Sequence, residues 1–211
     1  MHSIFIDGPE GSLECLLSEP LEQHKEPVKR IAVICHPHPM FSGSMDNKVV
    51  HTLARLYRDL SIPVVLFNFR GVGASEGSYA QGIGEVDDLA AIVEWLTQNV
   101  QPTELELAGF SFGSYVAATA AMNMQQDPRL KRVILIAPPV HHFEFQSYAN
   151  HNCPTVVVQG MADEVVPPEQ VIDWVDHNES PIQLVQMDDT SHFFHRKLVA
   201  LKQNLLDTLT S

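Results

Sequence analysis

The stretch ELAGFSFGSYVA, residues 106–117, places a serine midway between two glycines. An apolar run leads into it and a run of small residues follows, and Gly109, Ser111 and Gly113 fit the pattern G-x-S-x-G. A serine on a strained turn between a strand and a helix needs neighbours two positions away that have almost no side chain. The stretch therefore predicts a buried strand that ends at a serine and a helix that starts beside it.

Short runs rich in Val and Ile, like the one before Ser111, recur along the chain without alternating polar residues. They are RIAVICH (30–36), IPVVLFNF (62–69), ELELAGF (104–110), RVILIAPP (132–139), PTVVVQG (154–160) and IQLVQM (182–187). Continuous apolar runs of this length are typical of strands covered on both faces in a parallel sheet. In addition, HSIFIDG (2–8) and SLECLL (12–17) predict a hairpin at the edge of that sheet.

Helical patterns lie between these predicted strands. They are NKVVHTLARLYRDL (47–60), EVDDLAAIVEWLTQ (85–98), SYVAATAAMNMQ (114–125), PEQVIDWVDH (168–177) and RKLVALKQNLLDTL (196–209). Alternating strands and helices predict an α/β fold with a mostly parallel sheet and helices on both faces. The link VHHFEFQSYANHNC (140–153) is too short to hold a cap domain.

Length and charge narrow the functional classes. A chain of 211 residues is expected to form one domain, residues 1–211. The formal net charge is −13, from 13 Lys and Arg against 26 Asp and Glu, and we interpret this acidity as a contribution to solubility. Nucleic acids and anionic membranes both attract basic patches, so neither is an expected partner.

Cysteine usage and the first residues predict a cytoplasmic protein. The start, MHSIFIDGPEGSLECL, lacks a basic flank before an apolar core, and no apolar run is long enough to span a membrane. Three cysteines do not form a disulfide framework. Cys35 lies within the apolar run IAVIC, which favours a buried thiol over a nucleophile.

A serine needs a base to attack a carbonyl, and the base needs a carboxylate to orient it. Asp163 lies in GMADEVVP (160–167), just after one predicted strand, and His192 lies in DDTSHFFH (188–195), just after the next. The carboxyl ends of parallel strands share one edge of the sheet, so Ser111, Asp163 and His192 are expected to meet there in the order Ser, acid, His. The rival carboxylates are Glu164, Asp188 and Asp189.

Two other patterns were weighed as binding sites. His36 and His38 could suggest a metal site, but a spacing of one residue points two side chains to opposite sides of an extended chain, so no metal is expected. The loop Arg70–Gly73 is rich in glycine but lacks a phosphate-loop lysine, so we interpret it as a shaping element. Asn68 and Arg70 are candidates to brace, through hydrogen bonds, the loop after residues 30–36 that is expected to help hold an oxyanion. No organic cofactor is expected.

Four motifs together resemble the small, lidless bacterial branch of the α/β-hydrolase superfamily over nearly the whole chain. They are CHPHPMFSGSMDNKVV, FNFRGVGASEG, GMADEVVP and SHFFHRKL. The resemblance implies that Ser111, Asp163 and His192 are nucleophile, acid and base. Two departures occur: Ser42 stands at a position that is usually glycine, and the residues around Lys197 replace an expected glycine–arginine pair.

The transition state of acyl transfer needs backbone N–H donors for its oxyanion. The helix that follows Ser111 can offer the Phe112 N–H. The loop after residues 30–36 should supply a second donor, and because Pro37 and Pro39 have no N–H, His38 is the first choice and Met40 the second.

The prediction is thus a serine hydrolase that cleaves small acyl esters or thioesters through an acyl-enzyme intermediate. The partner would be a small-molecule ester, and the oligomeric state, monomer or homodimer, stays open. One alternative is a peptidase or amidase of the same fold. Another is a non-catalytic binding protein, because a fold alone does not carry chemistry.

Overall fold

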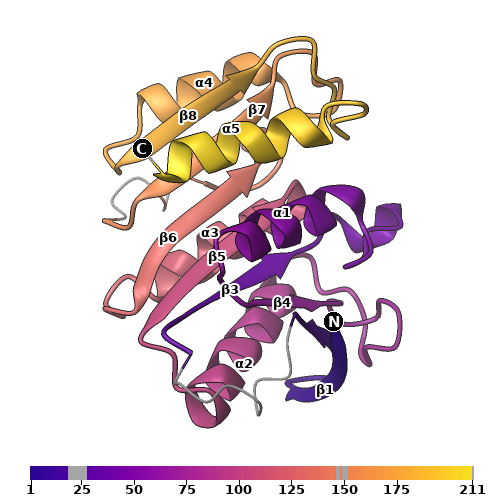
Figure 1. Cartoon of the computed structure of the whole chain (residues 1–211). Coiled ribbons are helices and arrows are strands. Elements are labelled where there is room, and N and C mark those ends of the chain that lie inside the picture. The colour runs from indigo at the N-terminus through magenta and orange to yellow at the C-terminus, as the bar shows by residue number, and fades with distance from the viewer. Residues whose placement is uncertain (19–27, 146–147, 149–151, 211) are drawn as a thin grey trace.

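The computed structural model describes residues 1–18, 28–145, 148 and 152–210. Its centre is an eight-stranded sheet in the order β1-β2-β4-β3-β5-β6-β7-β8 (Figure 1). The strands are β1 (His2–Gly8), β2 (Gly11–Leu17), β3 (Arg30–Cys35), β4 (Val64–Phe67), β5 (Glu104–Phe110), β6 (Leu130–Ile136), β7 (Thr155–Gly160) and β8 (Ile182–Met187). The neighbours from β4 to β8 all run parallel, so the predicted fold class is confirmed.

The predicted edge hairpin is present. β1 pairs antiparallel with β2, from His2 opposite Leu17 to Gly8 opposite Gly11, and β2 in turn pairs antiparallel with β4. The hairpin therefore closes one edge of the parallel sheet, while β8 forms the other edge.

Two strands, β4 and β6, end at least two residues before their apolar runs do, for identifiable reasons. β6 ends at Ile136 because Ala137 adopts a positive φ of 47° and the following Pro138 and Pro139 have no N–H for the ladder. β4 ends at Phe67, and the N–H of Phe69 donates to the ring of His36 instead of a neighbouring strand. Both strands thus end where the chain turns towards the carboxyl edge of the sheet.

Helices of the described residues cover the sheet on both faces (Figure 1). They are α1 (Lys48–Asp59), α2 (Ile83–Asn99), α3 (Phe112–Asn123), α4 (Pro168–Asp176) and α5 (Leu198–Thr210). Buried residues of α1 and α5 belong to one apolar layer, and those of α2, α3 and α4 belong to the other. The side chain of Glu85 accepts the Gly82 N–H at 2.7 Å, and this cap starts α2 two residues before the predicted pattern.

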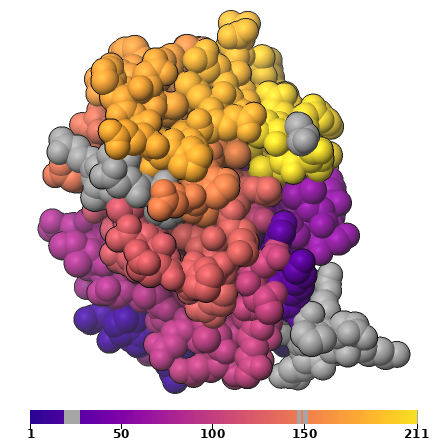
Figure 2. Space-filling view, turned by 90° about the vertical axis from the view of Figure 1, so that its left-hand side faces the viewer, coloured from indigo at the N-terminus to yellow at the C-terminus, as the bar shows by residue number. Residues whose placement is uncertain are grey.

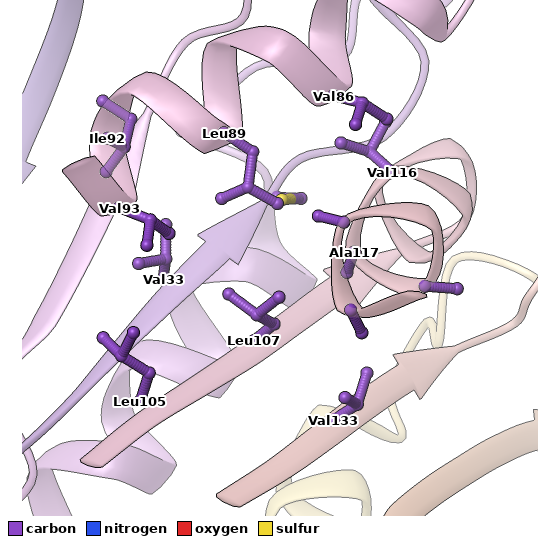
Figure 3. Close-up of a cluster of buried hydrophobic side chains, with 14 of the residues drawn as sticks. Val33, Val86, Leu89, Ile92, Val93, Leu105, Leu107, Val116, Ala117 and Val133 are labelled. Carbon is purple, nitrogen blue, oxygen red and sulfur yellow. The ribbon is translucent and has the colours of Figure 1, made fainter. Parts of the chain in front are cut away.

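The layer beneath α2 and α3 shows how the sequence pattern becomes a core. Figure 3 shows side chains of these helices pointing towards those of β3, β5 and β6: Val86, Leu89, Ile92, Val93, Val116 and Ala117 against Val33, Leu105, Leu107 and Val133. Full burial of each large aliphatic side chain contributes about 1.5–3 kcal/mol relative to exposure. These contacts fix both helices on the sheet, and with them the start of α3 beside Ser111.

The C-terminal part of the chain gathers at one end of the molecule, coloured orange and yellow in Figure 2. The described residues between β6 and β7 form no cap over the sheet. None of the helices in the described part of the chain is both long enough and apolar enough to cross a bilayer.

Candidate active site

Three side chains predicted from the sequence meet at the carboxyl edge of the sheet. Ser111 follows β5, Asp163 follows β7, and His192 follows β8. The Nε2 atom of His192 lies 3.1 Å from Ser111 Oγ, and its Nδ1 atom lies 2.8 Å from Asp163 Oδ2. Because a carboxylate can only accept, His192 Nδ1–H donates to Asp163, which leaves Nε2 of the neutral ring as an acceptor for the serine hydroxyl.

The turn at Ser111 has the strain that the sequence predicts. Ser111 has φ 53° and ψ −121°, a conformation rarely adopted by residues with a side chain. A Cβ atom on Gly109 would lie 2.1 Å from the Gly113 carbonyl oxygen, and one on Gly113 would lie 2.3 Å from the Cys35 carbonyl oxygen. The two glycines therefore allow β5, α3 and β3 to approach closely enough to hold this turn.

Asp163 is held by several donors. Its Oδ1 accepts the N–H groups of Val165 and Val166 at 2.8 and 2.7 Å, and Gln159 donates to Oδ2 at 3.2 Å. Burial raises the pKa of Asp163, but the hydrogen bonds from His192 and these backbone N–H groups outweigh it, and the net pKa is lowered. The lowered pKa therefore favours the ionised form of Asp163, which accepts the hydrogen bond that orients the ring of His192.

The rival carboxylates take other positions. Glu164 Oε2 accepts the backbone N–H of His192 at 3.2 Å, so it supports the histidine loop and not the imidazole. Asp188 contributes its backbone carbonyl, which accepts from Lys197 Nζ at 3.2 Å. Asp189 lies in a left-handed turn with φ 49°. Within the described residues, Asp163 is the one carboxylate with a hydrogen bond to the His192 ring.

The loop after β3 distinguishes the two candidate second donors. The Met40 N–H already donates to His38 Nδ1 at 3.2 Å, within a short 3₁₀ turn, Pro39–Phe41. In the part of the chain that the structure describes, no acceptor takes the backbone N–H of His38 or of Phe112. The geometry thus favours His38 over Met40 as the free donor beside Phe112.

The ring of His36 ties this loop to its neighbour. His36 Nε2 accepts the Phe69 N–H at 3.0 Å, and Nδ1 donates to the Pro37 carbonyl at 2.6 Å. Burial lowers the pKa of His36 to about 4, against a smaller opposite effect of the Pro37 hydrogen bond, so the ring stays neutral. Residue spacing suggests His36 only as a metal ligand and gives no sign of its bracing role.

His38 is also engaged through both ring nitrogens. Because Nδ1 accepts from Met40, the neutral ring carries its proton on Nε2, which lies 3.1 Å from the Tyr79 hydroxyl. Neither histidine of the His36–His38 pair therefore offers a free nitrogen for the metal site that the sequence analysis considered.

Asn68 and Arg70 brace different elements. Asn68 Oδ1 accepts the N–H of Met45, in the segment that follows the 3₁₀ turn, at 2.9 Å. Arg70 instead binds Asp88 of α2, with Nη2 2.7 Å from Oδ1, in a buried ion pair. Asn68 therefore supports the loop after β3, whereas Arg70, contrary to the expectation, fixes its own loop to α2.

Both departures from the motif fall at left-handed positions. Ser42, where glycine is usual, has φ 61°, and Arg196, immediately before Lys197, also has φ 61°. Side chains are strained at such angles, so glycine would fit either position with less strain. The loops keep the turns that glycine normally provides, although the residues differ.

Comparisons with known proteins agree on one family. The family model described as "alpha/beta hydrolase fold" matches residues 33–152. A solved alpha-beta serine hydrolase homologue from Coxiella burnetii is 41% identical, with a TM-score of 0.90, and the match covers 99% of this chain and 97% of that one. A serine hydrolase without a lid from Xanthomonas campestris is 43% identical, with a TM-score of 0.85 and coverage of 97% and 91%. An uncharacterized protein of Rickettsia prowazekii is 33% identical over 99% of this chain and 89% of its own length.

Proposed function

Because the chain belongs to the α/β-hydrolase family, we propose that it is a serine hydrolase that cleaves small acyl esters or thioesters. In this proposal Ser111 is the nucleophile, His192 the general base and Asp163 the acid that orients it. The observation that carries the proposal is the continuous chain of hydrogen bonds from Asp163 through His192 to Ser111 Oγ. No cofactor is required for this chemistry.

The first half-reaction forms the acyl-enzyme. His192 Nε2 takes the proton of Ser111 as Oγ attacks the carbonyl carbon, and Asp163 stabilises the imidazolium that results. The N–H groups of Phe112 and His38 donate to the oxyanion of the tetrahedral intermediate. His192 then gives its proton to the leaving alcohol or thiol, and the carbonyl reforms on Ser111.

The second half-reaction releases the acid. Water gives a proton to His192 and attacks the acyl carbon, and the same N–H donors hold the second oxyanion. His192 returns the proton to Ser111 Oγ as the bond to the acyl group breaks. The absence of a cap among the described residues between β6 and β7 leaves the site open, which favours small esters over long lipids.

The test compares ester hydrolysis by the wild-type protein and the Ser111→Ala variant. With p-nitrophenyl acetate and butyrate, kcat/KM should fall roughly 10³-fold or more, because the nucleophile is lost while the fold is kept. Ser3→Ala, on the exposed edge strand β1, is the matched control and should retain wild-type turnover. Far-ultraviolet circular dichroism checks that each variant is folded.

The outcomes separate the proposal from its alternatives. Wild-type turnover by folded Ser111→Ala would contradict the proposed nucleophile. Faster turnover of matched aminoacyl amides than of esters would favour a peptidase or amidase. A folded wild-type protein that turns over none of these substrates would favour a non-catalytic binding protein.

A further inference from the structure

A hollow of about 700 Å³ lies between the segment after β6 and helix α4. Three aromatic side chains line it: Phe143, Phe145 and Trp174, of which the last two pack edge to face with ring centroids 5.3 Å apart. Two carboxylates, Glu144 and Asp173, line it as well. The hollow thus combines aromatic surface with negative charge.

Ser111 does not itself line this hollow, but two residues that do, His141 and Phe143, link the hollow to the candidate site. The ring of Phe143 is 5.6 Å from that of Phe112, the residue that follows Ser111. Burial and then the charge of His142 lower the pKa of His141, which also lines the hollow; the charge of Asp163 acts in the opposite direction and that of His192 in the same one. A substrate bound at Ser111 can therefore extend a group into the hollow.

The chain around the hollow has an unusual charge pattern. Residues 133–195 contain no Lys or Arg, although the whole chain has 13. The same stretch contains nine carboxylates: Glu144, Asp163, Glu164, Glu169, Asp173, Asp176, Glu179, Asp188 and Asp189. Much of it lies in the orange end of the molecule in Figure 2. A surface of one sign next to a site attracts ligands of the opposite sign.

We propose that this hollow receives a cationic ammonium group of the substrate, so that the natural ester or thioester is positively charged. The inference rests on the serine hydrolase activity proposed above. A quaternary ammonium has no N–H groups that need acceptors, and it is stabilised by aromatic faces together with nearby negative charge. The rings of Phe143 and Trp174 and the carboxylates of Glu144 and Asp173 line the hollow together.

The other titratable groups that line the hollow are His141, His142 and His177. His177 Nδ1 lies 2.8 Å from the Asp173 carbonyl and 3.3 Å from its Oδ1, and these contacts raise the pKa of His177. A protonated imidazole would repel an ammonium group, so binding is measured at pH 8.5. The Asp173 side chain is 75% exposed and remains accessible to a ligand.

Binding is tested by calorimetric titration with choline and with 3,3-dimethylbutan-1-ol, in which carbon replaces the charged nitrogen. Choline should bind the wild-type protein about tenfold more tightly than its neutral isostere, because only choline gains from the rings and carboxylates. Equal affinity for the two compounds, or no binding of either, would overturn the proposed subsite.

Variants locate the binding. Asp173→Asn and Glu144→Gln should each weaken choline binding about two- to fivefold, and Trp174→Leu should weaken it at least about fivefold. Asp87→Asn removes one exposed carboxylate from α2, outside the hollow, and should change the affinity by less than about twofold. If Asp87→Asn weakened choline binding as much as Asp173→Asn does, choline would not bind in the hollow. Because Glu144 is exposed, Glu144→Gln should fold normally, and it provides the test if Trp174→Leu does not fold.

Hydrolysis separates this inference from the function on which it rests. The wild-type kcat/KM for acetylthiocholine should exceed that for 3,3-dimethylbutyl thioacetate about tenfold, and the ratio should fall in the Glu144→Gln/Asp173→Asn double variant. Equal kcat/KM values for the two thioesters would overturn the subsite and leave the hydrolase proposal standing. Choline binding without hydrolysis of any ester would overturn the hydrolase proposal and leave the subsite standing.

Discussion

At His36 one imidazole joins two loops that surround the candidate site. It accepts the Phe69 N–H and donates to the Pro37 carbonyl, so it sets the start of the segment that carries the His38 N–H. The bond from Phe69 needs a neutral ring, because protonation of Nε2 would remove its acceptor, whereas Nδ1–H donates to Pro37 in either state. The residue therefore links the stability of the fold to pH.

The pKa of His36, lowered by burial to about 4, gives a prediction for acid stability. An unfolded histidine binds a proton below about pH 6.5, whereas the folded one does so only below about pH 4. The unfolded state therefore binds more protons between these values, and the free energy of unfolding should fall by about 3 kcal/mol as the pH drops through this window. Urea unfolding at a series of pH values measures this loss.

The matched variant is His36→Gln, which keeps a donor and an acceptor but does not titrate. In His36→Gln the free energy of unfolding should depend less on pH between about pH 6.5 and 4. In His2→Gln, on the exposed strand β1, it should depend on pH as in the wild-type protein. Identical pH slopes for His36→Gln and the wild-type protein would show that His36 does not couple stability to pH.

The sequence predicts the three side chains of the candidate triad but not every backbone donor of the site. Ser111, Asp163 and His192 could be placed because each comes directly after an apolar run, and parallel strands bring their carboxyl ends together. The sequence ranks His38 before Met40 but does not decide between them, since the decision depends on a hydrogen bond from the Met40 N–H to a side-chain nitrogen. Spacing along the chain does not encode such a contact.

Between elements, the ion pair of Arg70 and Asp88 fixes the loop after β4 to helix α2. The Arg70 guanidinium and its backbone N–H all donate to the Asp88 carboxylate, at 2.7–3.1 Å, and both side chains are buried. Desolvation works against the charge of Arg70, but the bonds and charge of Asp88 outweigh it, so the pKa of Arg70 is raised. The loop is thereby held beside His36 and the segment after β3.

Removal of the Asp88 charge should weaken this junction. Asp88→Asn removes the carboxylate that contacts the buried guanidinium most closely, and the free energy of unfolding should fall by about 3 kcal/mol. The neighbouring Asp87 is exposed, so Asp87→Asn should change it by less than about 0.5 kcal/mol. Urea unfolding at neutral pH compares the two variants, and equal effects would mean that the ion pair does not hold α2.

The elements themselves were predicted to within a few residues because their signals are local. The apolar run at 132–139 predicts a strand that continues to residue 139, but β6 ends at Ile136. Pro138 and Pro139 are apolar, yet they have no N–H for the ladder. The helix after Ser111 begins at Phe112, two residues before the helical pattern, and the Ser111 carbonyl accepts the Ser114 N–H at 2.8 Å. Element ends depend on hydrogen bonds that hydrophobicity does not report.

For the whole molecule, the sheet is the common support of both apolar layers. We propose that residues 1–211 unfold as one domain, since β3 and β5 each contribute to both layers and the strands pair without interruption from β1 to β8. The order of those strands could not be predicted, because apolar runs identify strands but not their neighbours. Local patterns likewise give no sign of the hollow beside α4.

The two tryptophans test the single domain. Trp95 lies on α2 and Trp174 on α4, two helices far apart along the chain. Single-tryptophan variants, Trp95→Phe and Trp174→Phe, should give fluorescence transitions in urea that each coincide with the loss of helix in the same variant. Transitions that separate within one variant would indicate two units that unfold independently.

The central claim is that Ser111 is an activated nucleophile, and covalent labelling tests it most directly. A fluorophosphonate should form one adduct on the folded wild-type protein, detected by intact-mass spectrometry and mapped to the peptide that contains Ser111. Labelling should be abolished in Ser111→Ala and strongly slowed in His192→Ala, because the base is then missing. A folded wild-type protein that forms no adduct, or forms it at a residue other than Ser111, would contradict the account.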